Sequence, residues 1–285
     1  MNDKTVLVAG AGGVLGLEIV RVLRGRGRIV TGAYRTERGG AREAIEAAGA
    51  TPLRLDLEDG AALRDALAAA DAAIFTPILT VSAPAATLLR ADQPAVFFSS
   101  NNVAVDPQAA VYAALREKED QTRAAAPQAV ILRPTMIYGY PGDGNLSRLM
   151  AAMRARPLIP IPAASGALQQ PIYVKDLAKI AAGALFDAGM QGRTRAVAGP
   201  EPVALRALYR ETGIAAAASP LMLPFPTELF AAIVGALEKT GLNLPVSAAQ
   251  LARAGMDKIP QDPAILGDTP LQEGLKTLAA EMARP

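Results

Sequence analysis

The first half of the sequence repeats one unit: a short apolar run, a turn, and an Ala-rich stretch with Leu or Ile at helical spacing. Short apolar runs bounded by turns predict strands, and apolar residues every three or four positions predict amphipathic helices. The predicted strands are Thr5–Ala9, Ile29–Ala33, Pro52–Leu55, Ala72–Thr76, Ala95–Ser99 and Ala129–Arg133. The predicted helices are Val14–Arg24, Arg42–Ala48, Ala61–Ala69, Pro84–Ala91 and Ala109–Ala125. Strands that alternate with helices pair in parallel, so the sequence predicts a doubly wound α/β fold with a parallel sheet.

The alternation ends after Arg133-Pro134. Three prolines between residues 157 and 162 predict a broken stretch, residues 171–174 are expected to be extended, and a helix is expected to open at Asp176 as its N-cap. Further prolines separate short helical pieces after residue 220. We therefore expect residues 1–135 to form the sheet domain, and residues 136–285 to form a smaller C-terminal substrate lobe that is partly interleaved with the sheet.

A glycine-rich loop joins the first predicted strand to the first predicted helix. Gly10, Gly13 and Gly16 fit the spacing G-x-x-G-x-x-G. This position and spacing are typical of a tight turn whose backbone approaches a pyrophosphate at the N-terminus of a helix. The alternative is a tight turn without a ligand. The residues expected to form the dinucleotide site are Gly10, Gly12, Gly13, Val14, Leu15 and Gly16.

The residue after the second strand bears on which dinucleotide binds, because an acidic residue there would bond a ribose 2′-hydroxyl and an arginine would accept a 2′-phosphate. This sequence has Arg35 at that point, with Arg38 nearby, which favours NADP(H) over NAD(H). The alternative for Arg35 is a solvated surface side chain. Asp56 and Leu57 follow the third strand and are placed to contact the adenine, although Asp56 alternatively caps the next helix.

Composition excludes several kinds of chemistry. The chain of 285 residues has neither Cys nor His. It therefore has no thiolate or imidazole to ligate a metal, and no metal site is predicted. Catalytic triads that need His or Cys are excluded as well, so proton transfer is left to Tyr, Lys, Asp or Glu.

Charge and hydropathy narrow the expected partners and location. The formal net charge is +2 and both signs are interspersed, which argues against nucleic-acid binding. No segment has the 18 or so uninterrupted apolar residues of a membrane span, and the N-terminus has no signal-peptide pattern. We therefore expect a cytoplasmic protein that acts on a small molecule.

The chain resembles the NAD-dependent epimerase/dehydratase group, the extended or atypical short-chain dehydrogenases, over residues 4 to about 200. The resemblance rests on Gly10/Gly13/Gly16 and on three segments: 97–100 (Phe-Phe-Ser-Ser), 131–139 (Ile-Leu-Arg-Pro-Thr-Met-Ile-Tyr-Gly) and 171–178 (Pro-Ile-Tyr-Val-Lys-Asp-Leu-Ala). It implies a Rossmann domain, a substrate lobe built from the C-terminal part, a place for Pro134 at the cofactor, and a homodimer.

The catalytic positions implied by this resemblance are Asn101, Tyr112 and Arg116. The group uses a Ser or Thr after the fifth strand, and a Tyr followed four residues later by a Lys that lowers its pKa and holds the nicotinamide ribose. Only the tyrosine is retained, since none of the seven lysines follows a tyrosine at that spacing and Lys118 comes two residues too late. Arg116 would stabilise a tyrosinate and Asn101 would orient a carbonyl. Alternatively, Tyr112 packs on the sheet.

The resemblance also bears on the substrate. In sugar-nucleotide members an arginine contacts the diphosphate at the position occupied here by Gln169, so the missing charge disfavours a sugar nucleotide. The leading hypothesis is an NAD(P)(H)-binding oxidoreductase or epimerase-like enzyme acting on a small carbonyl or hydroxyl compound. The alternative is a non-catalytic dinucleotide-binding redox sensor or assembly factor. A methyltransferase is a third candidate, disfavoured by the glycine spacing and by the absence of an acidic residue after the second strand.

Overall fold

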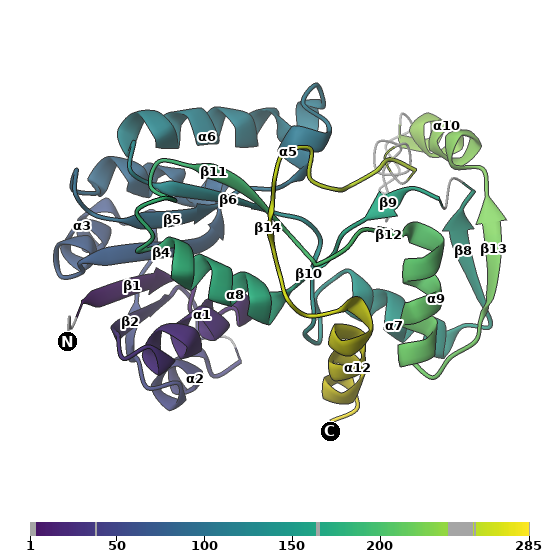
Figure 1. The fold of residues 1–285 in the computed structure, drawn as a ribbon, viewed down its shortest axis with the longest axis horizontal. Coiled ribbons are helices and arrows are strands. Elements are labelled where there is room, and N and C mark those ends of the chain that lie inside the picture. Colours follow the sequence, from purple (N-terminus) through teal and green to yellow (C-terminus); the bar gives the residue numbers. More distant parts are fainter. Residues whose placement is uncertain (1–3, 38, 164–165, 239–252, 254, 285) are drawn as a thin grey trace. The chain divides into compact units, whose positions relative to one another are not determined.

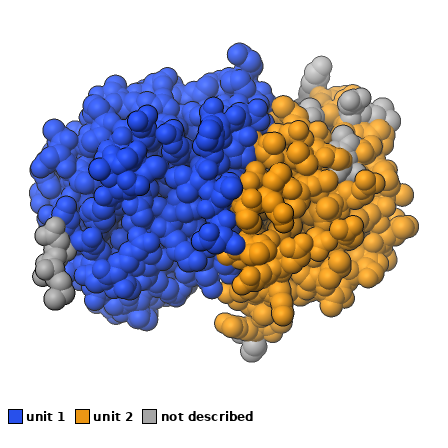
Figure 2. Space-filling model, viewed as in Figure 1, with its two compact units in different colours: residues 1–135, 172–198, 260–268 blue, residues 136–171, 199–259, 269–285 orange. Residues whose placement is uncertain are grey.

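The computed structural model describes residues 4–37, 39–163, 166–238, 253 and 255–284. Arg38, which shares the Arg35 hypothesis, lies outside the described residues. The chain divides into two compact units (Figure 2). Unit 1 contains residues 1–135, 172–198 and 260–268, and unit 2 contains residues 136–171, 199–259 and 269–285.

Unit 1 is built on an eight-stranded sheet in the order β14-β11-β6-β5-β4-β1-β2-β3 (Figure 1). The first six strands in the chain are β1 (Thr5–Ala9), β2 (Ile29–Tyr34), β3 (Thr51–Arg54), β4 (Ala72–Ile78), β5 (Ala95–Phe98) and β6 (Val130–Pro134). The last two are β11 (Thr194–Ala198) and β14 (Ile265–Leu266). The adjacent strands are parallel. The predicted doubly wound α/β fold is confirmed, and two segments from the second half of the chain extend its sheet.

Helices cover both faces of this sheet (Figure 1). One face carries α1 (Val14–Gly25), α2 (Ala41–Ala47) and α8 (Val174–Ala184), and the other carries α3 (Gly60–Ala68) and α6 (Ala113–Ala125). Beneath α3 and α6 lies an apolar core in which Phe75 of β4 stacks on Phe97 of β5, with ring centroids 4.7 Å apart. Asp59 caps α3, because its carboxylate accepts the N–H groups of Ala61 and Ala62. The remaining strand of unit 1 is β10 (Ile172–Tyr173).

Unit 2 has two small sheets and a group of helices. Strand β8 (Leu158–Pro162) pairs in parallel with β13 (Leu221–Phe225), and β9 (Leu168–Gln169) pairs antiparallel with β12 (Val203–Ala204). Three helices pack together: α7 (Leu146–Ala155), α9 (Leu205–Ala215) and α12 (Leu271–Met282). The unit also contains β7 (Ile137–Tyr138) and α10 (Thr227–Glu238). Among the described residues, no helix combines the length and the apolar character needed to cross a bilayer.

Three local predictions are wrong. The helix expected at residues 84–91 is a short α4 (Leu79–Ser82) followed by a 3₁₀ helix, η1 (Ala83–Leu88), because β4 continues to Ile78 and shortens the connection. The helix expected from residue 109 begins with the 3₁₀ turn η2 (Ala110–Tyr112), and a further short helix, α5 (Asn102–Val105), precedes it. The stretch at 157–162, expected to be broken, contains strand β8. Within the described ranges β8 pairs with β13 alone, so the missing N–H groups of its prolines cost few hydrogen bonds between strands.

The predicted capping role of Asp176 is also wrong. Helix α8 begins at Val174 with Tyr173 as N-cap, so Asp176 lies within the first turn. Its buried carboxylate accepts the N–H of Asp268 at 3.1 Å and pairs with Lys179. Its negative charge, in the first turn of α8, also interacts favourably with the positive end of the helix dipole. Asp176 therefore fastens the segment that follows β14 to α8, which is a structural role.

Candidate functional site

Close backbone approach explains the glycines after β1. Gly10 has φ of +80°, and a Cβ on it would lie 2.3 Å from Oγ1 of Thr76. A Cβ on Gly16 would lie 2.2 Å from the carbonyl oxygen of Gly10, which is backbone and cannot turn aside. The N–H of Gly13 donates to that same carbonyl at 3.0 Å. The loop is thus folded tightly enough that only glycine fits at positions 10 and 16.

The N-terminus of α1 follows directly. Gly13 is its N-cap, and the first N–H to bond within the turn is that of Leu17, which donates to the Gly13 carbonyl at 2.9 Å. The N–H groups of Val14, Leu15 and Gly16 therefore have no partner inside the helix. The first turn contains no acidic residue, so the positive end of the helix dipole is not neutralised. This arrangement suits an anionic ligand.

A cavity of about 390 Å³ opens in front of this helix end, at the carboxyl ends of β1, β2 and β3. Six residues predicted to bind the cofactor line it: Gly10, Gly12, Gly13, Arg35, Asp56 and Leu57. The other lining residues were not predicted from the sequence; they are Ala9, Ala33, Tyr34, Thr36, Leu55, Pro77 and Val81. The strand order could have indicated Pro77 and Val81, because β4 lies beside β1 and the carboxyl ends of parallel strands lie along the same edge of the sheet.

Two charged side chains line the cavity just after β2 and β3. Arg35 is exposed, and Asp56 is exposed as well. Oδ1 of Asp56 accepts the N–H of Glu58 at 3.1 Å, which leaves the second carboxylate oxygen for another donor. Tyr34, just before Arg35, has a raised pKa because it is buried and lies beside Glu37. The cavity therefore presents one exposed cation and one exposed carboxylate at the carboxyl ends of two neighbouring parallel strands, β2 and β3.

The predicted catalytic residues stand on the helical connection after β5. Tyr112 ends η2 and packs, half-buried, against the apolar core under α6. Arg116 lies one turn later, and its Nη2 donates to the Ala109 carbonyl at 3.3 Å, while Nη1 is buried with no hydrogen-bond partner in the described part of the chain. Lys118 donates to Gln121 on the exposed side of α6, so it does not replace Arg116.

Asn101 lies in a different setting. Its N–H donates to the Pro134 carbonyl at 3.0 Å, which ties the ends of β5 and β6 together. Its side chain is 1% exposed, and neither amide atom has a hydrogen-bond partner among the described residues. Asn101 lines a second cavity of about 340 Å³, with residues that include Arg133, Thr194 and Asp262.

Several predicted site residues lie outside the two cavities. Tyr112 and Arg116 line neither of them. The first cavity is also not lined by four of the predicted cofactor residues, which are Val14, Leu15, Gly16 and Pro134.

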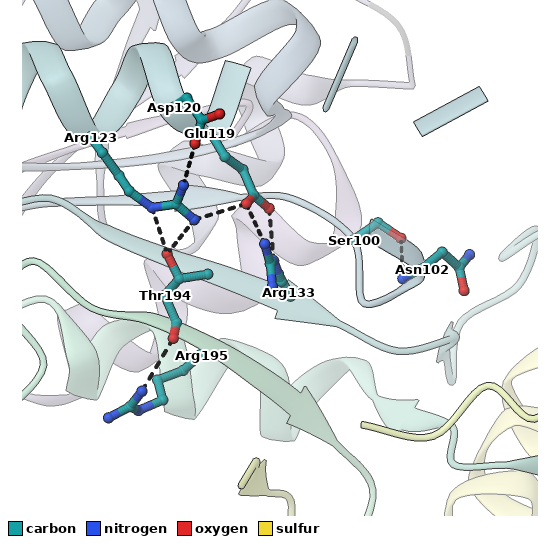
Figure 3. Close-up of polar contacts among 8 residues, drawn as sticks. All are labelled: Ser100, Asn102, Glu119, Asp120, Arg123, Arg133, Thr194 and Arg195. Atoms are coloured by element: carbon teal, nitrogen blue, oxygen red, sulfur yellow. Dashed lines mark hydrogen bonds and ion pairs between the residues drawn. The ribbon is translucent and has the colours of Figure 1, made fainter. Parts of the chain in front are cut away.

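A buried ion-pair network, missed by the sequence analysis, holds α6 on the sheet (Figure 3). Nε of Arg133 on β6 donates to Oε1 of Glu119 at 2.8 Å, and its Nη2 binds Oε2. Arg123 bridges Oε2 of Glu119, at 3.0 Å, and the hydroxyl of Thr194 on β11. Burial would raise the pKa of Glu119, but the hydrogen bonds and charges of the two arginines outweigh it and lower that pKa. Glu119 is one turn beyond Arg116, so the network fixes the rotation of the helix that carries Tyr112 and Arg116.

No protein-family model matches the chain. Solved structures do match it over nearly its whole length. A dTDP-glucose 4,6-dehydratase from Bacillus anthracis in complex with NAD has a TM-score of 0.74 at 10% identity, with 98% of this chain and 96% of that chain covered. A Thermus thermophilus UDP-glucose 4-epimerase complex with NAD has a TM-score of 0.64 at 19% identity, with 97% and 98% covered. A short-chain dehydrogenase/reductase superfamily protein from Agrobacterium tumefaciens with bound NAD has a TM-score of 0.66 at 17% identity, with 98% and 97% covered.

These similarities show the fold. The chain has the Rossmann architecture of NAD-bound epimerases, dehydratases and short-chain dehydrogenases, and the predicted fold is confirmed. At these identities the fold does not carry over an activity or a set of catalytic residues.

Proposed function

We propose that unit 1 binds a nicotinamide dinucleotide in the cavity in front of α1. The observation that carries the proposal is the N-terminus of α1, which has no side-chain cap and faces a cavity of about 390 Å³. The loop before it is tightly folded, since a Cβ on Gly10 or Gly16 would lie within 2.3 Å of another atom. The N–H groups of Val14, Leu15 and Gly16 would bond the pyrophosphate. Solved structures of the same fold that contain NAD support this class of cofactor.

We propose NADP(H) as the preferred form. Arg35 lines the cavity and is exposed, so its guanidinium is available to a 2′-phosphate. Asp56 and Leu57 would contact the adenine, and Pro134 would lie at the nicotinamide end. No acidic residue follows β2 at the position where one would bond a 2′-hydroxyl.

The proposed activity is that of an oxidoreductase or epimerase-like enzyme acting on a small carbonyl or hydroxyl compound. The bound dinucleotide would supply or accept the hydride. Tyr112 would exchange a proton with the substrate oxygen, and the permanent charge of Arg116 would favour the tyrosinate. Asn101 would donate a hydrogen bond to the carbonyl. We further propose that unit 2 provides the substrate lobe and that the protein is a homodimer, which light scattering of the purified protein would test.

The decisive test is a titration with NADPH and NADH followed by their own fluorescence, since the chain has no Trp to contribute emission. Gly13→Asp should abolish binding of both, because it adds a negative charge at the N-cap. Arg35→Ala should weaken NADPH about tenfold, the loss of roughly 1.4 kcal/mol, and leave NADH unchanged. Arg64→Ala, an exposed arginine on α3, is the matched control. Tighter binding of NADH than of NADPH, with both affinities unchanged in Arg35→Ala, would reverse the NADP(H) preference.

Turnover is tested separately. Tyr112→Phe should remove most hydride transfer in a substrate screen without changing NADPH affinity, and Tyr209→Phe in α9 should leave both unchanged. Full activity of Tyr112→Phe would refute the catalytic role. Tight NADPH binding with no turnover of any carbonyl or hydroxyl substrate would instead support the non-catalytic dinucleotide-binding alternative.

A further inference from the structure

The parallel pair β8 and β13 of unit 2 has one apolar face toward solvent. The two strands lie side by side (Figure 1), with Leu221 beside Leu158 and Leu223 beside Pro160. All four side chains are exposed, and the exposed fraction is 42% for Leu158, 65% for Leu221 and 50% for Leu223. Because successive residues of a strand point to opposite faces, these four residues share one face, which we call the outer face.

The inner face of the same sheet explains why the strands form but not why the outer face is apolar. Ile159 and Ile161 alternate with the outer-face residues of β8 and are buried, and α7 contacts this strand. A strand with one face on the core normally carries polar residues on the other face. The outer face has only Leu and Pro, and exposed apolar patches of this kind mark surfaces where a protein meets another body.

Two arginines stand where both strands begin. An open groove of about 460 Å³ lies there, and its lining includes Arg154, Arg156, Pro157 and Pro220 but no Asp or Glu among the described residues. Both arginines are exposed. Nε of Arg154 donates to the Ala216 carbonyl at 3.2 Å, and neither arginine forms an ion pair within the described part of the chain. The outer face is therefore bordered by two cations that lack a carboxylate partner there.

The sequence around these strands is also free of acidic residues. Residues 144–171 contain three arginines, and neither this segment nor residues 212–227 contains Asp or Glu. Glu211, just before the second segment, is paired with Arg210 at 3.0 Å. An apolar face beside cations matches an anionic bilayer, because leucines enter the boundary between headgroups and acyl chains while arginines bind lipid phosphates.

A second copy of the chain fits this surface less well. In a two-fold dimer the same patch meets itself, so two arginines from each copy would come together without a carboxylate from either patch. A bilayer instead supplies the anions that the patch lacks. We propose that the outer face, with Arg154 and Arg156, docks unit 2 reversibly on an anionic lipid surface. This docking does not depend on the proposed dinucleotide site.

Sedimentation with lipid vesicles tests the proposal on the full chain. Wild type should bind vesicles with about one phosphatidylserine for every two phosphatidylcholines at least tenfold more tightly than pure phosphatidylcholine vesicles. High salt should weaken this binding, because exposed charges are screened. Leu221→Ser/Leu223→Ser should weaken it at least tenfold. The matched control is Ile29→Ser/Leu266→Ser, which replaces two exposed apolar residues of unit 1 and should bind as wild type.

The two arginines are tested through their charge. Arg154→Gln/Arg156→Gln should weaken binding to the anionic vesicles by about 25-fold, at roughly fivefold for each cation near the lipid surface. Arg154→Lys/Arg156→Lys keeps both charges and should retain most of the binding. The control Arg64→Gln/Arg206→Gln removes two exposed arginines outside the groove. Thermal unfolding of each variant separates a loss of binding from a loss of folding.

Three outcomes decide the proposal. Equal binding of wild type and Leu221→Ser/Leu223→Ser, or equal binding to anionic and neutral vesicles, would overturn it. Sedimentation velocity without lipid tests the second copy: a dimer that dissociates in Leu221→Ser/Leu223→Ser, in a protein that does not bind vesicles, would overturn docking on lipid in favour of self-association. Loss of vesicle binding in that variant with an unchanged oligomeric state would support the lipid surface.

Discussion

The same substitution at the two ends of α1 should have opposite effects. A Cβ at Gly16 would stand 2.2 Å from the Gly10 carbonyl oxygen, whereas ordinary contacts begin at 3.4 Å, so the loop and helix must separate by about 1 Å. At Gly25, the last residue of the helix, no atom lies within 4 Å of a Cβ. Gly16→Ala therefore tests the tight loop, and Gly25→Ala is its control within one helix.

The magnitudes follow from two opposing contributions. Overpacking costs about 1–3 kcal/mol, and replacing Gly by Ala in a helix returns up to about 1 kcal/mol. Gly16→Ala should lower the free energy of unfolding by about 1–2 kcal/mol, which lowers Tm by roughly 2–8 °C at about 2–4 °C per kcal/mol. Gly25→Ala should raise the free energy of unfolding by about 0.5 kcal/mol.

Binding supplies the second measurement. A shift of about 1 Å moves the first-turn N–H groups away from a pyrophosphate, so Gly16→Ala should weaken NADPH at least tenfold, about 1.4 kcal/mol. Gly25→Ala should bind as wild type. Thermal unfolding and NADPH fluorescence measure the two effects. A Gly16→Ala variant as stable as Gly25→Ala, with wild-type NADPH affinity, would refute the account of the loop.

Three further outcomes concern the network under α6. Glu119→Gln should lower the free energy of unfolding by about 3 kcal/mol, since removing one partner of a buried pair leaves Arg133 uncompensated, whereas Glu117→Gln on the exposed side should stay within about 0.5 kcal/mol in urea unfolding. The double variant Glu119→Leu/Arg133→Leu should recover most of that loss, and a double variant worse than Glu119→Gln would contradict the uncompensated charge as the cause. Because the folded pKa of Glu119 is lowered, the stability it contributes is complete above its usual value of 4.5 and is lost as the pH falls towards the folded value. Unfolding curves between about pH 6 and 3 should therefore fall more steeply for wild type than for Glu119→Gln, and parallel curves would count against the pair.

Local patterns were sufficient for the parallel sheet and for the glycine loop. Apolar periodicity located β1 to β6 within one or two residues, because a strand buried on both faces must be apolar along its length. The spacing of Gly10, Gly13 and Gly16 located the turn before α1, since close approach is a property of the residues in the turn itself. The positions of Arg35, Asp56 and Leu57 in the lining of the first cavity could also be predicted, because the carboxyl ends of parallel strands lie along one edge of the sheet.

Contacts between distant segments were decided only by the tertiary structure. Strands β11 and β14 have few residues and little periodicity, and they form because β11 pairs with the edge of β6 and β14 pairs with the edge of β11. Glu119 and Arg133 are charged residues in an apolar setting. They are 14 residues apart in the sequence, and the ion pair between them offsets the free-energy cost of burying each charge. The sequence by itself determined the elements and the loop, because propensity and turn geometry are local, whereas the charge environment of each side chain depends on residues that the fold brings from far along the chain.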